Sequence, residues 1–509
     1  MALSTETRNL YIERENKRRL NSFPAYNSLN LGASISFGIF LFLLLNALDF
    51  SGGSFNINMT VFLVALVYFI PAAISYCLAR KVKSEILKNG DVSTFTRRFG
   101  FLLLPFTLAF NVFVAIAGFM IIKRERSVEY LLAAWSVLTS VAVMAISLVN
   151  VFKPAVSPTF FLGMGFLATL AVFYIIVTVL INRWVRDQQV DKRMLPFAVL
   201  LIITAVSGNL FALALGLVLL SKIKNQGKEK NIEWVDVLRR LFRNNTAILG
   251  MFFVAFLFMV SICSGLTFDN RVAVDSNFQT LLSSPTLRFP FGTDEFGRCV
   301  FTRIIFGARI SLIVGLVSTA IPIVIGGILG AIAGHYGNVL DNTIMRFLDI
   351  LFAVPNIFLA IAIIAAFGVS ITNLIIALSV GMIPIYARTM RAQVLSVSNS
   401  EFVEAAKANG QKRHMIVIKH IIPNSMAPII VRASLGIGSA VLSTSALSFL
   451  GLGVEPHVPE WGNVLRTGSR FLELHPYLAI YPGLAIVLIV LAFNYFGDGL
   501  RDALDPKLK

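Results

Sequence analysis

Twelve long apolar runs dominate this sequence and restrict the folds open to it. Each run approaches the ~20 residues that an α-helix needs to cross the hydrocarbon core of a bilayer. Of the 509 residues, 56% are hydrophobic and only 14% are charged. A soluble protein of this size cannot bury so much apolar surface. The sequence therefore predicts an all-α, polytopic membrane protein with about twelve transmembrane helices.

The runs form two groups of six on either side of a charged stretch, residues 221–245. This stretch ends in an amphipathic pattern (Trp234, Val237, Leu238 and Leu241), which is typical of a helix in the membrane interface. The first group predicts an N-terminal membrane extension over residues 1–220, with runs at 31–48, 59–79, 99–122, 128–152, 159–181 and 195–220. The second group predicts a membrane core over residues 246–509, with runs at 246–266, 310–333, 343–367, 372–389, 425–450 and 477–496.

The basic residues favour a cytoplasmic N-terminus. With six spans before residue 221, 19 Lys and Arg residues fall on the cytoplasmic side and 7 on the outside, as the positive-inside rule requires. Two basic clusters, at 123–126 and 183–193, face outward in this topology and break the rule. One run is therefore a candidate re-entrant hairpin, and Pro105 and the Ser207-Gly208-Asn209 break are the places where a run could turn back.

Several functions are disfavoured by what the sequence lacks. The net charge of +17 comes mostly from short loops between apolar runs, with no nucleic-acid-binding signature around them. Three cysteines, Cys77, Cys263 and Cys299, form neither a disulfide framework nor a metal-binding spacing, so no metal or cofactor is expected. The absence of a G-x-x-x-x-G-K-[ST] motif means that any ATPase must be another polypeptide. We expect the chain itself not to be an enzyme.

A polar, basic island, SEFVEAAKANGQKRHMIVIKHIIPN (residues 400–424), interrupts the second group of runs. Ser400 is suited to cap a short helix, and Gly410 suits a turn that needs a positive φ. Pro423 closes the island before the next run. A helix–glycine–helix on the cytoplasmic face indicates an element that docks into another protein; the alternative is an ordinary amphipathic connector.

Four motifs together resemble the C-type permease of oligopeptide, dipeptide and nickel ABC importers. They are the EAA pattern of the island with its glycine, FGTDEFGRCVFTRIIFGARISL, FLGLGVEPHVPEWGNVL and the C-terminal FGDGLRDALDPKLK. The resemblance covers residues 234–509, about half of the chain, and does not extend to the six preceding runs. It implies peptide as the substrate class in preference to nickel or another small solute.

The resemblance also implies partners and contact residues. The permease would pair with a second, homologous permease, two ATPase subunits and an extracytoplasmic substrate-binding protein in the cell membrane, with both termini cytoplasmic. The island would be the coupling loop, seated in a cleft of the ATPase. Its implied contact and shape-determining residues are Glu401, Glu404, Ala405, Ala406, Gly410 and Pro423.

Within the core, glycines recur every four residues at Gly326, Gly330 and Gly334, which leaves one helix face nearly bare. Such a face favours close packing of another helix over pore lining. Pro322 and Pro355 are expected to kink their runs. Asp349 is expected to be an interfacial charge or a partner of Arg346.

Three positions depart from the family pattern: Cys299, Thr302 and His457 stand where relatives often have Asp, Ser and Pro, so the resemblance assigns them no ligand role. The outer segment 292–298 has the composition of a turn in which Thr293 or Asp294 caps a helix.

Two other classes of function remain open for this sequence. An ion-driven transporter is disfavoured because the last two runs contain no carboxylate, and a structural scaffold is disfavoured by the coupling-loop motif.

Overall fold

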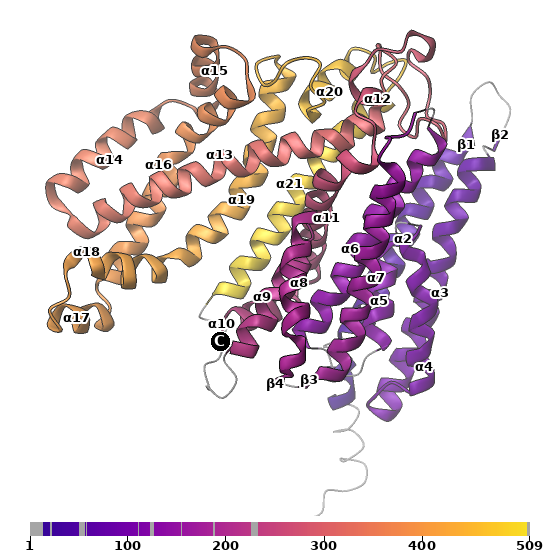
Figure 1. Cartoon of the computed structure of the whole chain (residues 1–509), viewed down its shortest axis with the longest axis horizontal. Coiled ribbons are helices and arrows are strands. Elements are labelled where there is room, and N and C mark those ends of the chain that lie inside the picture. Colours follow the sequence, from indigo (N-terminus) through magenta and orange to yellow (C-terminus); the bar gives the residue numbers. More distant parts are fainter. Residues whose placement is uncertain are drawn as a thin grey trace, which may run out of the picture. The chain divides into compact units, whose positions relative to one another are not determined.

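The computed structural model describes residues 14–20, 23–49, 56–57, 59–109, 111–122, 127–153, 155–186, 189–224 and 233–505. The predictions for most of the N-terminal leader, for the basic cluster 123–126, for the linker at 225–232 and for the tail at 506–509 lie outside these residues. The described chain is helical apart from two short β-hairpins, β1 (Leu48–Asp49) with β2 (Asn56–Ile57) and β3 (Val185–Arg186) with β4 (Gln189–Val190) (Figure 1). The all-α polytopic class is confirmed.

The chain divides into two compact units. The first comprises residues 1–149 and 164–232, and the second comprises residues 150–163 and 233–509. The first unit contains α2 (Pro24–Ala47), α3 (Met59–Asn89), α4 (Thr94–Arg98), η2 (Phe99–Thr107), α5 (Val112–Ile122), α6 (Val128–Leu148), most of α7 (Phe160–Trp184), η4 (Lys192–Met194), α8 (Leu195–Thr204), η5 (Ala205–Ser207) and α9 (Leu210–Lys224).

The run at 99–122 is a helical hairpin and not a single span. Its two arms, η2 and α5, pack so closely that a Cβ on Gly100 would lie 2.7 Å from the carbonyl oxygen of Gly118. Beyond the turn, Asn111 Nδ2 donates to Ser36 Oγ at 2.7 Å, and Tyr68 Oη donates to the Ala109 carbonyl at 2.8 Å. Because Ser36 lies midway along α2, the hairpin tip reaches only the middle of that helix.

The run at 195–220 also turns back, between α8 and α9. Gly208 has a φ of +89° at the turn, and a Cβ on Gly216 would lie 2.9 Å from the Ala198 carbonyl oxygen. Asn209, at the tip, donates to the carbonyl of Ser136, which lies in the middle of α6, at 3.0 Å. The side-chain amides of Asn111 and Asn209 thus find hydrogen-bond partners on neighbouring helices. The polar groups of a re-entrant loop need such partners, because the loop must be covered by protein.

The first unit therefore repeats one pattern: two long helices followed by a half-length hairpin. Nine helices in the described residues are long and apolar enough to cross a membrane, or ten if one bent pair is a single span. Four of them precede residue 221, so the count of about twelve, with six in the extension, is corrected. Both suspected breaks, near Pro105 and at 207–209, turn the chain back. Composition could not reveal this because hairpin arms and spans are equally apolar.

The second unit holds five long helices and the bent pair. In chain order its elements are η3 (Val149–Phe152), α10 (Glu233–Leu241), α11 (Asn245–Thr267), α12 (Arg271–Val274), η6 (Phe278–Thr280), α13 (Val300–Tyr336), α14 (Asn338–Ala353), α15 (Asn356–Phe367), α16 (Ile371–Ser398), α17 (Glu401–Ala408), α18 (Arg413–Ile416), η7 (Val417–Ile421), α19 (Ile422–Phe449), α20 (Trp461–Ser469) and α21 (Tyr477–Leu504). Helices α14 and α15 meet at 84°, with Pro355 at the break, whereas α13 continues through Pro322.

The three spaced glycines lie along the contact between α13 and α16. A Cβ would lie 2.7 Å from the Ile383 carbonyl oxygen at Gly326, 2.2 Å from that of Ala387 at Gly330 and 2.8 Å from that of Arg391 at Gly334. Figure 1 shows the two helices running side by side over much of their length. The bare face thus lets two backbones approach each other.

The connection between α6 and α7 (residues 150–163) belongs to the second unit. Asn150 Nδ2 donates to the Thr267 carbonyl at 2.9 Å, at the C-terminal end of α11. Lys153 is buried; its Nζ donates to Thr302 Oγ1 at 2.6 Å and lies 4.9 and 5.0 Å from the ring centroids of Phe268 and Phe301. Burial lowers the pKa of Lys153 to about 8. This connection is therefore packed at the end of the core that carries the loop after α11.

Candidate functional site: the coupling loop and the two ends of the core

The predicted coupling loop, residues 400–424, forms two short helices joined at a glycine. Helix α17 ends at Ala408, Gly410 adopts a φ of +71°, and α18 begins at Arg413. The loop projects from the opposite end of the second unit to α12 and α20 (Figure 1). A π-helical turn, η7, leads into α19, whose first turn contains Pro423. The helix–glycine–helix pattern therefore has the geometry of a compact protrusion.

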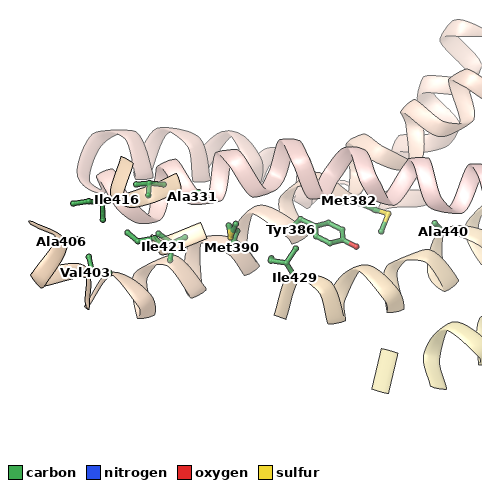
Figure 2. Close-up of a cluster of buried hydrophobic side chains, with 12 residues drawn as sticks. Ala331, Met382, Tyr386, Met390, Val403, Ala406, Ile416, Ile421, Ile429 and Ala440 are labelled. Atoms are coloured by element: carbon green, nitrogen blue, oxygen red, sulfur yellow. The ribbon is translucent and has the colours of Figure 1, made fainter. Parts of the chain in front are cut away.

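One side of the loop is anchored in the core. Val403, Ala406, Ile416 and Ile421 are buried in a cluster with Met390 of α16, and Figure 2 shows these side chains between the loop and the long helices. We call these buried loop residues the root of the protrusion. Because the root is packed tightly against α16 and α19, we expect the protrusion to move together with these helices. The remaining apolar members of the cluster are Ala331, Met382, Tyr386, Val394, Val417, Ile429 and Ala440.

The other side of the loop is exposed. Glu401, Glu404 and Ala405 are all exposed, and the carboxylate of Glu404 makes no hydrogen bond or ion pair among the described residues. A Cβ on Gly410 would meet nothing within 4 Å. Of the predicted contact residues, Ala406 alone is buried within the chain; Pro423 is exposed at the start of α19. Their contact with an ATPase stays a prediction.

Two ion pairs connect α14 to α16 near the loop. Arg391 makes a bidentate contact with Asp341, at 2.6 and 2.5 Å. Arg388 Nη2 lies 2.6 Å from Asp349 Oδ1, so the partner of Asp349 is Arg388 and not Arg346. These pairs brace the helix that leads directly into the loop.

At the opposite end, Asp294 organises the loop before α13. Its carboxylate accepts from the backbone N–H of Phe296 and Arg298 at 3.0 and 2.9 Å and from Arg298 Nε at 2.8 Å. Arg303, fully buried, lies 3.7 Å from the same carboxylate and donates to the Ala273 carbonyl at 2.9 Å. Asp294 is therefore the centre of a buried ionic network and does not cap a helix as expected. Thr293 instead bonds within the loop, to Thr280 and Ser283.

Comparison with protein families identifies the second unit. Residues 326–509 match the family described as binding-protein-dependent transport system inner membrane component, and residues 233–283 match the N-terminal TM domain of oligopeptide transport permease C. The chain is 44% identical over 276 residues to the dipeptide transport system permease protein DppC of Alkalihalophilus pseudofirmus, covering 54% of this chain and 90% of that protein. The chain belongs to the permease family of binding-protein-dependent ABC importers.

Other members of this permease family give the same extent of match. The glutathione transport system permease protein GsiD of Pectobacterium atrosepticum is 38% identical over 282 residues, covering 55% of this chain and 94% of the relative. The Escherichia coli O157:H7 protein of that name is 40% identical over 276 residues, covering 54% and 91%. Inward-facing structures of the MetNI methionine ABC transporter match with a TM-score of 0.34 and 19% identity, covering 40% of this chain and 97% of the structure's chain.

The permease core contains a buried acid that sequence reasoning missed, Glu460. It is fully buried, caps α20 through the backbone N–H of Asn463 at 3.1 Å, and accepts from Ser311 and Ser445 at 3.4 and 3.3 Å. Burial raises its pKa above the usual range of a glutamate. The adjacent Trp461 donates to the Ile304 carbonyl at 2.8 Å. The FLGLGVEPHVPEW stretch is thus packed against α13, a role that its expected position in a loop between two membrane helices did not indicate.

Arg432 is a second missed residue. It lies in α19, within the apolar run at 425–450, and its side chain is exposed. An ionisable residue inside a membrane helix is costly and usually functional. The signal was visible in the sequence, because Arg432 is the one charged residue of that run.

Proposed function

We propose that this chain is the C-type permease subunit of an ATP-driven importer of peptides. One feature carries the proposal: a rigidly rooted cytoplasmic protrusion that exposes Glu401, Glu404 and Ala405, in a core of the importer-permease family. Relatives named for dipeptide and glutathione transport support a peptide substrate. The partners are a homologous permease, two ATPases and an extracytoplasmic binding protein. ATP-driven closure of the ATPases moves the loop and rocks the helices above it.

Co-purification tests this function. The full-length chain, tagged in its native membrane and gently solubilised, should bring down a second permease and a P-loop ATPase at two copies per complex. Deletion of the chain should lower the uptake of labelled di- and tripeptides by at least tenfold, with uptake sensitive to ATP depletion. If intact chain purifies without any P-loop protein and peptide uptake is sensitive only to uncouplers, the importer proposal is wrong.

We also propose a topology for the N-terminal extension, in which four helices cross the membrane and both hairpins enter from the cytoplasm. It starts from the packing of residues 150–163 at the end of the core opposite the coupling loop. With that end outside, 25 of the 26 Lys and Arg residues in residues 1–245 fall on the cytoplasmic side. The single outer one is Lys153, which is buried against Thr302. Both violations of the positive-inside rule disappear, which supports this topology.

Cysteine mapping distinguishes the two topologies. In a Cys77→Ser background, Ala155→Cys should react with a membrane-impermeant maleimide on intact cells, and Gln189→Cys should react only after permeabilisation. Both positions are exposed, and the six-span topology predicts the reverse pattern. Glu401→Cys, in the coupling loop, is the cytoplasmic control. Labelling of Gln189→Cys but not Ala155→Cys on intact cells would overturn the four-span arrangement.

A further inference from the structure

Arg432 lies at the junction of two cavities within the permease core. The smaller, of about 240 Å³, is bounded by α15, α16 and α19 and is lined by Asn356, Tyr386, Ser439 and Ser443 together with Arg432. The larger, of about 1100 Å³, runs from Arg432 to the cytoplasmic ends of α10, α19 and α21. Arg432 and Leu435 line both cavities. The two cavities therefore share one cationic side chain, Arg432, within a membrane helix.

The face of α19 that bears Arg432 is unsuited to lipid. Arg432, Gly436, Ser439 and Ser443 recur at intervals of four, three and four residues and so share one side of the helix. Arg432 and Ser439 are exposed and the other two half-buried. Polar residues in membrane helices face a bundle interior or a water-filled space, because hydrocarbon offers them no partner. These four residues therefore line a water-filled space, and another subunit must form the other side of that space.

The guanidinium of Arg432 makes no hydrogen bond or ion pair with any residue that the structure describes. Its backbone carbonyl accepts a hydrogen bond from the hydroxyl of Tyr386 at 3.3 Å. Among the described residues, no carboxylate lines the smaller cavity. In the larger cavity the carboxylates are Asp236, which pairs with Arg239 at 3.0 Å, and Asp505, beside the further cations Arg240 and Arg501. The guanidinium of Arg432 can therefore bind an anion, because no acid in the part of the chain that the structure describes pairs with it.

We propose that Arg432 binds a carboxylate of the cargo as it passes along α19, and so gives the permease its own preference for acidic peptides. Arginine suits this task because its planar fork binds carboxylates with two parallel hydrogen bonds and remains charged at any physiological pH. Ser439, Ser443 and Asn356 line the next part of the wall and can hydrogen-bond peptide groups. The inference rests on the proposed function, since it requires peptide cargo between the permeases.

The first experiment measures import by the complete importer in cells with three labelled tripeptides, Ala-Glu-Ala, Ala-Gln-Ala and Ala-Lys-Ala. Arg432→Gln should lower the ratio of acidic to basic peptide import about tenfold, the value of one good charge-assisted contact. Arg432→Lys should restore only part of this ratio, because it keeps the charge but loses the second parallel hydrogen bond. An unchanged ratio in Arg432→Gln, whether or not total import falls, would overturn the proposal. Failure of the wild type to import any of the three peptides would overturn the proposed function as well.

The second experiment tests whether position 432 is accessible to water in the assembled complex. In the Cys77→Ser background, Arg432→Cys should react with a charged thiol reagent in inside-out vesicles, and excess Ala-Glu-Ala should slow the reaction. Val487→Cys, an exposed position in α21, serves as the control whose reaction rate the peptide should not change. If Arg432→Cys is inert, a lipid or the partner permease covers this face, and the site for cargo is excluded.

Discussion

Replacing Glu404 with arginine is expected to abolish peptide import while leaving the protein folded and in the membrane. Glu404 is exposed on α17 and makes no contact that its own fold requires, so reversing its charge costs little stability. In the proposed complex it meets a basic group of the ATPase, and two like charges would then face each other at the coupling interface. We expect at least a 50-fold loss of uptake, with the ATPase subunits reduced or lost on co-purification.

Two controls make this result specific. Glu473→Arg reverses an exposed charge in the loop between α20 and α21, away from the coupling loop, and should leave uptake unchanged. Ala406→Arg places a charge in the buried root of the loop and should lower the amount of folded protein, unlike Glu404→Arg. If Glu404→Arg reduces membrane abundance as much as Ala406→Arg does, the residue is structural and its coupling role is contradicted.

Replacing Gly330 with valine is expected to be the most damaging single change in the core. The new Cβ would lie 2.2 Å from the Ala387 carbonyl oxygen and 2.9 Å from Met390 Cβ, and backbone cannot rotate out of the way. Helices α13 and α16 must then separate along their whole contact, which we expect to cost on the order of 3 kcal/mol or more. The measurement is the fraction of monodisperse protein that survives heating in detergent.

Gly327→Val is the matched control, because it adds the same side chain three residues earlier on α13. A Cβ at Gly327 would meet nothing within 4 Å. We expect this variant to purify and resist heating as the wild type does. Equal loss in both variants would show that helix propensity, and not the α13–α16 contact, decides the outcome.

The fold of the predicted coupling loop could be inferred from the sequence because its signals are local. A serine at the N-cap position, a helix-forming segment and a glycine in a positive-φ turn occur within eleven residues. The Ser400 side chain makes no capping hydrogen bond, so the helix-forming segment and the glycine turn are the signals that the structure confirms. The structure has α17 from Glu401 to Ala408 and the turn at Gly410, as predicted. The orientation of each side chain was less accessible. Ala406 packs inward while Ala405 points outward, and this difference follows from the position of Met390 on another helix.

The partners of the core charges depended on packing between helices. The sequence offered Arg346 to Asp349 as the near neighbour, but α16 lies beside α14 and places Arg388 within 2.6 Å. Glu460 gave no signal either, because its burial requires α13, α19 and α20 to meet around it. Contacts of this kind join residues distant in the chain, and no periodicity encodes them.

The sequence by itself determined that this protein is an all-helical membrane permease and where its helix–glycine–helix protrusion lies. Those properties follow from the length of apolar runs, from basic residues between them and from short motifs. Only the tertiary structure showed which runs form hairpins. Residues 99–122 and 195–220 are apolar enough for spans, yet each turns back because Asn111 and Asn209 find hydrogen-bond partners in the middle of α2 and α6. A buried amide is tolerable at that depth only when another helix supplies its partner.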